Sequence, residues 1–287
     1  MKILKLFVTL FAGATLISCS SAMHSSSGSN SVYSNTNDCD CGSSDKNPSK
    51  IMKEFDVKPF NGISASSGIK IHYTQADTRS VLIETDEETM KRLEVETVSG
   101  RLALRLKQDK ADMKIQIQHI NDNCHIVAYI SAPDLNEVNL SGWASLNAPE
   151  FSNTSDFKFS GSGASGLNID KMTLNNAQFN CSGGSSVISQ VIKAGNAKFN
   201  MSGGAHSNVE QINAPELNFN LSGGSRAEIK LNSGNVNINT SGGATFKAQG
   251  KTTTISINCS GGSNANVNKL SYSNNSFSTS GGGRITK

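Results

Sequence analysis

The stretch Phe199-Asn200-Met201-Ser202-Gly203-Gly204 is one copy of a pattern that recurs eight times in the second half of the chain. The pattern is an apolar residue, usually an asparagine, an apolar or small residue, and then Ser-Gly. Its serines are Ser141, Ser160, Ser182, Ser202, Ser222, Ser241, Ser260 and Ser280. Successive serines lie 19 to 22 residues apart, and a period near twenty residues is typical of stacked repeats. The sequence therefore predicts a solenoid over residues 136–287.

Apolar and polar residues alternate within each copy, as in Phe179-Asn180-Cys181 and Phe219-Asn220-Leu221. This order predicts a strand with one buried face, whereas the glycine pairs prevent helical runs. The alternation resumes after each Gly-Gly, so each coil is expected to contain two or three short strands separated by glycine corners. The predicted fold is all-β, a parallel β-helix (β-solenoid) with about 20 residues per coil and coils stacked about 4.8 Å apart.

The predicted stacking also determines whether two cysteines of the repeat region can form a disulfide. Cys181 and Cys259 occupy the same inward position four coils apart, which is roughly 19 Å at the strand spacing. A disulfide needs Cα atoms within about 7 Å. The two residues are therefore expected to be separate buried thiols.

Composition limits the class of protein. The chain has 287 residues with 26 Lys and Arg against 23 Asp and Glu, which argues against a nucleic-acid partner. Aromatic residues make up 6% of the chain, and Trp143 is the single tryptophan. A solenoid tolerates this scarcity because each coil is buried by its neighbours.

The N-terminus has the features of an export signal. Lys2 and Lys5 precede an apolar run at residues 6–17 that is too short to span a bilayer. The run ends in Leu16-Ile17-Ser18-Cys19, which resembles a bacterial lipobox. Residues 1–18 are therefore predicted to be a lipoprotein signal peptide, with Cys19 as the lipid-attachment residue that anchors the protein to a membrane. The alternative is an ordinary signal peptide followed by a chance cysteine.

Residues 19–50 are rich in Ser, Asn and Gly and are expected to form a flexible tether. They contain Cys39-Asp40-Cys41. A metal or redox role for this pair is disfavoured, because zinc sites usually need two such pairs. Export to an oxidising compartment favours some oxidised form, and the redox state of Cys39 and Cys41 stays open.

Residues 51–135 are also β-rich. Alternating runs predict strands near 69–73, 81–83, 102–106, 115–117 and 126–130. Residues 86–93 are expected to form one or two helical turns, with acidic residues first and basic residues last, and Ser99-Gly100 marks a tight turn. This part either begins the same solenoid or caps it.

The order Phe60-Asn61-Gly62-Ile63-Ser64, Ser67-Gly68-Ile69-Lys70-Ile71 and Val81-Leu82-Ile83-Glu84-Thr85-Asp86 is similar to the opening of the head GIN domain family of auto-transporter adhesins. The resemblance covers about residues 55–287. It implies a right-handed β-helix in a secreted or lipid-anchored protein of Bacteroidetes-type bacteria. Because these are scaffold motifs, they say more about fold than about activity.

Two departures limit what the resemblance implies. The sequence closes on Arg284-Ile285-Thr286-Lys287 without the ten-residue alternating segments of a membrane barrel, so a translocator is not expected. Nor does an acidic run follow Cys19 to indicate export to the cell surface. An outer-membrane lipoprotein is expected, with its periplasmic or cell-surface orientation left open.

Chemical motifs are sparse, and no cofactor or metal is predicted. The five histidines are scattered, and a turn explains the nearest approach to a cluster, His119 and His125 around residues 121–124. The glycine repeats lack the Asp of calcium-binding repeats and the Lys of a phosphate loop. The densest carboxylates of the repeat region are expected to solvate a rim rather than to form a catalytic pair, so an enzyme is not expected: Asp134, Glu137, Glu150 and Asp156.

The remaining candidate is the outer surface. The residues between the apolar pairs are Asn139, Lys158, Asn180, Asn200, Asn220, Asn239, Asn258 and Ser278. Five of them are expected to form an outward ladder that hydrogen-bonds along the rod, beside the neighbouring serines, and this structural role is the favoured interpretation: Asn180, Asn200, Asn220, Asn239 and Asn258. The alternative is that they bind a glycan or another protein. Trp143, which breaks the glycine pattern, is expected to plug the end of the rod rather than to lie exposed beside this face.

The leading hypothesis is a non-catalytic, lipid-anchored envelope protein whose rod serves adhesion or binding, where adhesion rests on the family resemblance. Its expected partners are a membrane, through the lipid, and a glycan or protein ligand. The alternative is a structural or sensory envelope component without an external ligand. A β-helical enzyme acting on glycans is the least favoured hypothesis.

Overall fold

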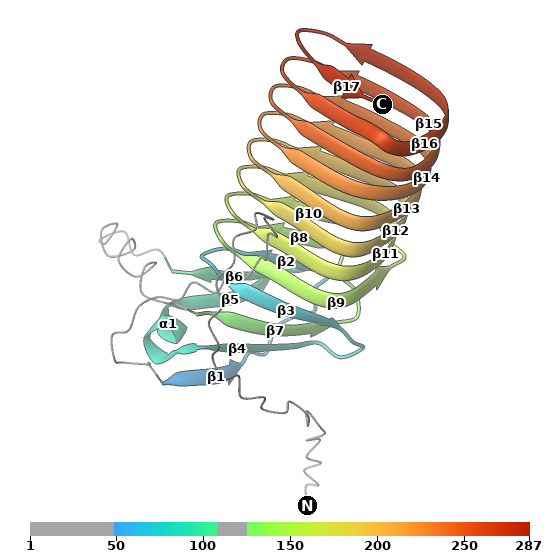
Figure 1. Ribbon diagram of the computed structural model, residues 1–287. Coiled ribbons are helices and arrows are strands. Elements are labelled where there is room, and N and C mark those ends of the chain that lie inside the picture. The colour runs from blue at the N-terminus through green and yellow to red at the C-terminus, as the bar shows by residue number, and fades with distance from the viewer. Residues whose placement is uncertain (1–48, 108–124) are drawn as a thin grey trace, which may run out of the picture. The chain divides into compact units, whose positions relative to one another are not determined.

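The computed structural model describes residues 49–107 and 125–287, which fold almost entirely into strands of one continuous sheet (Figure 1). In the second half each strand pairs in parallel with the strand of the next coil. The strands are β8 (Glu137–Leu140), β9 (Ser145–Asn153), β10 (Phe157–Gly161), β11 (Gly166–Cys181), β12 (Ser186–Met201), β13 (His206–Leu221), β14 (Arg226–Thr240), β15 (Thr245–Cys259), β16 (Asn264–Thr279) and β17 (Arg284–Thr286). The predicted parallel β-solenoid is confirmed.

Each central coil contains one long strand rather than two or three short ones. Strand β12 runs for 16 residues around the coil, and four residues then form the corner before β13. Pairing between β12 and β13 continues on both sides of the bend, with Ile192 opposite Ile212 and Asn196 opposite Glu216. The expectation of two or three short strands per coil was therefore wrong, because pairing resumes in the same register beyond each bend and the strand runs on.

The core is a column of stacked side chains. The ring centroids of Phe179 and Phe199 lie 4.6 Å apart and those of Phe199 and Phe219 lie 4.8 Å apart, and all three residues are fully buried. Cys181 and Cys259 are buried free thiols, as predicted. The twenty-residue repeat therefore places equivalent residues directly above one another.

The register differs from the sequence prediction at one coil. Residues 159–163 contain two Ser-Gly pairs, and the corner uses the second, because Gly163 has φ 66° whereas Gly161 ends strand β10. Ser160 therefore pairs with Asn180, and Lys158 does not occupy the asparagine position. A Cβ atom on Gly161 would lie 2.8 Å from the ring of Phe159, so glycine suits this inward position.

The first part of the chain contributes two further coils. Their strands are β2 (Gly62–Ala65), β3 (Lys70–Gln75), β6 (Arg101–Leu106) and β7 (Val127–Ala132). Strand β2 pairs in parallel with both β6 and β8, and β3 pairs in parallel with both β7 and β9. The β2–β3 coil is thus enclosed between a coil that comes later in the sequence and the first repeat coil.

The same part also closes the end of the solenoid. Antiparallel pairs join β1 (Lys50–Glu54) to β4 (Ser80–Asp86), β4 to β7, and β5 (Leu93–Val98) to β6. The predicted helical turn is α1 (Glu87–Arg92), capped by Asp86, which accepts a 2.8 Å hydrogen bond from the Thr89 amide. Residues 51–135 therefore both continue the solenoid and cap it.

Several sequence predictions lie outside the described residues. They are the signal peptide at residues 1–18, Cys19, most of the segment 19–50 with Cys39 and Cys41, the strand near 115–117, and the turn at 121–124. They stay predictions.

Candidate ligand-binding groove

The corners of the solenoid stack closely because their glycines have no Cβ atom to hold neighbouring coils apart. Gly203 has φ 66°, and a Cβ atom there would lie 3.0 Å from the carbonyl oxygen of Gly183. The amide of Gly204 donates a 2.7 Å hydrogen bond to the same oxygen, and the amide of Ser202 donates a 2.9 Å bond to Cys181. Each corner is thereby fixed directly over the previous one.

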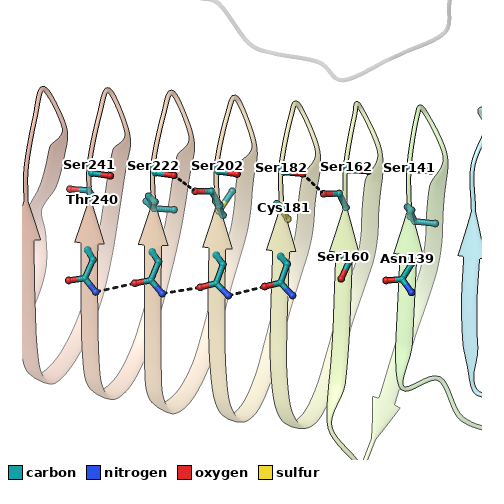
Figure 2. Close-up of a pocket in the computed structure, with 18 of the residues that line it drawn as sticks. Asn139, Ser141, Ser160, Ser162, Cys181, Ser182, Ser202, Ser222, Thr240 and Ser241 are labelled. Atoms are coloured by element: carbon teal, nitrogen blue, oxygen red, sulfur yellow. Dashed lines mark hydrogen bonds between the residues drawn. The ribbon is translucent and has the colours of Figure 1, made fainter.

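The asparagines before the corners form one continuous ladder. Each lies between two buried residues, as Asn200 does between Phe199 and Met201, so its side chain points outward. Successive Nδ2 to Oδ1 distances from Asn200 to Asn180, Asn220 to Asn200, Asn239 to Asn220 and Asn258 to Asn239 are 2.8, 2.9, 3.0 and 3.0 Å. Figure 2 shows part of this ladder as a row of dashed lines. The predicted ladder is confirmed, and all four bonds point toward the N-terminal coils. Ligand binding by the ladder stays a prediction.

A row of serines runs beside the asparagine ladder at the corners. The hydroxyl groups of Ser182, Ser222 and Ser260 donate to main-chain carbonyl groups of the preceding coil at 3.4, 3.5 and 3.3 Å. The side chains are therefore held by the neighbouring coil, and the serine oxygens keep accepting capacity.

The two rows form a groove of about 820 Å³ along the rod. It extends from Ser64 of the β2–β3 coil to Ser260 after β15, and its lining side chains are amides, hydroxyls and small or apolar groups. None of the lining residues is Asp, Glu, Lys, Arg or His. Figure 2 shows the corner serines side by side in one row across successive coils, from Ser141 to Ser241.

The cysteine that lines the groove, Cys181, is also uncharged. Burial raises the pKa of the Cys181 thiol to about 11, so this group is uncharged at pH 7. Glu137 stands two residues before the groove residue Asn139, and the pKa of its carboxyl group is lowered by a hydrogen bond from Arg101 and also by one from Asn139. Its charge is thus compensated by the Arg101 guanidinium.

Trp143 does not plug the rod, which corrects the favoured prediction. Its side chain is 67% exposed. Trp143 occupies the second corner position, where Gly184 stands in a later coil, and a Cβ atom on Gly184 would have 3.6 Å to its nearest neighbour. Side chains at this position therefore point to solvent. Ser141 lines the groove, whereas Trp143 is not among the lining residues.

A second ladder, not predicted from the sequence, lies on another face of the coils. The amide of Asn176 donates to Asp156 at 2.7 Å, and that of Asn196 donates to Asn176 at 2.9 Å. These residues line a charged groove of about 520 Å³ that also includes Lys198 and Glu216. The sequence carries a signal for it, because Asn176 and Asn196 both stand three residues before a core phenylalanine, although they lie away from the Ser-Gly pairs.

The other candidate chemical groups are dispersed. Glu137 pairs with Arg101 and Asp156 with Asn176, which gives two of the four rim carboxylates structural partners. The ring of His72 stacks on Tyr129 at 5.5 Å. Within residues 49–107 and 125–287, no three His, Cys, Asp or Glu side chains come together in a way that could hold a metal ion.

A known protein family matches most of this chain. The family model described as "Putative auto-transporter adhesin, head GIN domain" matches residues 59–230 and 197–286. The chain belongs to the head GIN domain family. This membership points to an adhesin-like protein of the envelope or cell surface. Within the residues that the structure describes, this head GIN chain has no helix that is long and apolar enough to cross a bilayer.

Solved structures share the fold at low identity. A "putative adhesin" from Parabacteroides merdae is 16% identical, with a TM-score of 0.71 over 84% of this chain and 97% of that chain. A "putative lipid binding protein" and a "putative adhesin" from Parabacteroides distasonis are 15% and 13% identical. Their TM-scores are 0.65 and 0.63, over 84% and 82% of this chain and 98% and 97% of theirs. No curated protein matches the chain. At these identities the likeness extends to the head GIN fold alone.

Proposed function

We propose that this head GIN protein is a non-catalytic adhesin, anchored in the outer membrane by lipid on Cys19, whose uncharged groove binds an external ligand. The asparagine ladder carries the proposal. Each amide inside the ladder uses one N–H and one oxygen lone pair for its neighbours, as Asn220 does with Asn200 and Asn239. One N–H and one lone pair of each amide remain for a ligand.

The spacing of these groups suits a polymer. The free donors and acceptors repeat along one row at the coils that carry Asn200, Asn220 and Asn239, about 4.8 Å apart. A ligand with regularly repeated polar groups could engage several coils at once, so that weak individual contacts combine into useful avidity. Because the lining residues carry no charge, the matching ligand is a neutral, hydroxyl-rich chain such as a glycan.

The first experiment is a screen of the purified protein against glycan, matrix-protein and lipid panels. The lipid panel is included because one structural neighbour is described as lipid-binding. Asn220→Lys places a charged side chain in the middle of the groove, whereas Asn208→Lys adds the same charge to an exposed position of the same strand outside the groove. We expect Asn220→Lys to lose the detected binding and Asn208→Lys to keep it. Equal behaviour of the two variants would exclude the groove as the binding site.

The second experiment tests location. Protease treatment of intact cells should remove the protein if it faces outward, and Cys19→Ala should release it from the membrane fraction. Resistance of the protein in intact cells, together with cleavage after the outer membrane is opened, would instead favour the structural or sensory alternative. Incubation with any glycan identified in the screen, followed by assay for new reducing ends, tests the enzyme alternative.

A further inference from the structure

The asparagine ladder is interrupted at one coil. The strand register places Ser160 directly between Asn139 and Asn180, so a hydroxymethyl group stands where the following coils carry a carboxamide. All three residues line the groove, and Figure 2 shows Ser160 between Asn139 and the ladder. We call this position, bounded by Asn139, Ser160 and Asn180, the ladder gap.

The polar groups on the two sides of the ladder gap are complementary. The Oδ1 atom of Asn180 accepts hydrogen bonds from Asn200 at 2.8 Å and from Gln178 at 3.0 Å, while its Nδ2 donates to no described residue. Asn139 forms a side-chain hydrogen bond with Glu137, to whose carboxylate only its N–H groups can donate. Figure 2 shows the oxygen of Asn139 on the side of Ser160. Among the described residues, a donor without a partner therefore faces an acceptor without a partner across the gap.

The size of the gap corresponds to one amide. Asn139 and Asn180 are two coils apart, about 10 Å at the strand spacing, and each ladder amide bridges one step of about 4.8 Å. The missing group must accept from the Asn180 Nδ2 and donate to the Asn139 Oδ1. A trans secondary amide directs its C=O and N–H in opposite directions, so one such group meets both requirements. Within the described residues the Ser160 hydroxyl makes no hydrogen bond, so it is available as a third contact.

We propose that the ladder gap binds the acetamido group of an N-acetylated amino sugar in a glycan that lies along the groove. This inference rests on the proposed function and specifies its substrate class. A peptide also carries secondary amides, but its residues repeat every 3.3 Å or so, which does not match the coil step of about 4.8 Å. Pyranose rings in an extended β-1,4-linked chain repeat close to the coil step, and their hydroxyls suit the uncharged lining.

The test compares three probes by calorimetric titration of the purified protein. They are the β-1,4-linked tetramer of N-acetylglucosamine, cellotetraose, in which hydroxyls replace the acetamido groups, and an acetylated tetraserine amide. Two hydrogen bonds to an acetamido group should make the N-acetylated tetrasaccharide bind about tenfold more tightly than cellotetraose. Equal affinities, no binding of the N-acetylated tetrasaccharide, or tighter binding of the peptide would overturn the inference.

Variants of Ser160 test whether the preference for the acetamido sugar arises at the ladder gap. Ser160→Asn supplies the missing amide and should abolish the preference for the acetamido sugar, whereas Ser160→Ala leaves the gap open and should retain it. Ser278→Asn is the matched control, because Ser278 occupies the same repeat position beyond Asn258 at the other end of the ladder. Loss of the preference in both Asn variants, or in neither, would overturn the inference.

Two further measurements distinguish misfolding of the Ser160→Asn variant from loss of the proposed contact. Thermal unfolding shows whether Ser160→Asn is folded, and Asn180→Asp offers a second test, since it replaces the donor with a carboxylate oxygen and should also remove the preference. If Asn220→Lys abolishes binding in the panel screen while Ser160→Asn and Asn180→Asp leave the preference unchanged, the groove remains the binding site and only the ladder gap is excluded.

Discussion

Replacing Phe199 with alanine should destabilise the middle of the rod far more than its end. The Phe199 ring is fully buried and stacks on Phe179 at 4.6 Å and on Phe219 at 4.8 Å. Phe-to-Ala changes in cores cost about 3–5 kcal/mol, and the loss of two stacked neighbours places this variant near 4 kcal/mol. The matched control is Phe277→Ala in β16, where the ring is partly buried and contacts Tyr272 at 5.7 Å, and we expect about half that cost or less.

Hydrogen exchange followed by mass spectrometry suits this comparison, because repeat arrays need not unfold in a single two-state step. A local loss of about 4 kcal/mol corresponds to roughly thousandfold faster exchange of the β12 amides. Phe199→Leu, which preserves most of the volume, should cost about 1.5 kcal/mol at most. If Phe199→Ala accelerated exchange in β12 by less than about tenfold, or no more than Phe277→Ala does in β16, the stacked column would not be a main source of stability.

Three further predictions concern the corner, the ladder and the thiol. Gly203→Ala should cost at least about 1–2 kcal/mol in denaturant unfolding because of its positive φ, whereas Gly204→Ala should cost clearly less; equal costs would contradict the corner model. Asn220→Ala removes two ladder hydrogen bonds and should cost about 1–3 kcal/mol, against little change for Asn208→Ala, and similar values would show that the ladder is not stabilising. Burial raises the pKa of Cys181 from 9.0 to about 11, so the unfolded chain loses this proton first and the contribution of the thiol to stability should fall as the pH rises from 9 to 11. Peptide mapping after iodoacetamide treatment at pH 8 should find Cys181 unmodified in the folded protein and modified in denaturant, and rapid labelling of folded protein would contradict its burial.

The sequence was sufficient to predict the regular part of the molecule. The column of Phe179, Phe199 and Phe219 and the ladder of asparagines both follow from a repeat near twenty residues with strand alternation, because each rests on equivalent positions in neighbouring coils. The ambiguous coil was not predictable by spacing alone. Residues 159–163 offer two Ser-Gly pairs, and only the packing of Phe159 against Gly161 decides between them.

Other features depend on contacts that spacing does not reveal. The direction of Trp143 follows from corner geometry rather than from hydrophobicity, since the second corner residue points outward whatever its side chain. The ladder gap became visible only after the register placed Ser160, and not Lys158, opposite Asn180. The spatial order of the first coils could not be predicted from the sequence either, because the β2–β3 coil pairs with strands about 40 and about 75 residues away in the sequence.

The enclosed position of the β2–β3 coil has a consequence for how the rod can be built and can vary in length. That coil must be covered on both sides by segments synthesised after it, so the first three coils form together as a seed, whereas every later coil needs only the one before it as a template. Duplication or deletion of one later repeat would then change the reach of the protein by a single step of about 4.8 Å and leave the seed intact. Insertions inside the seed would have no such freedom. Variation in length among such rods should therefore accumulate toward the C-terminal end.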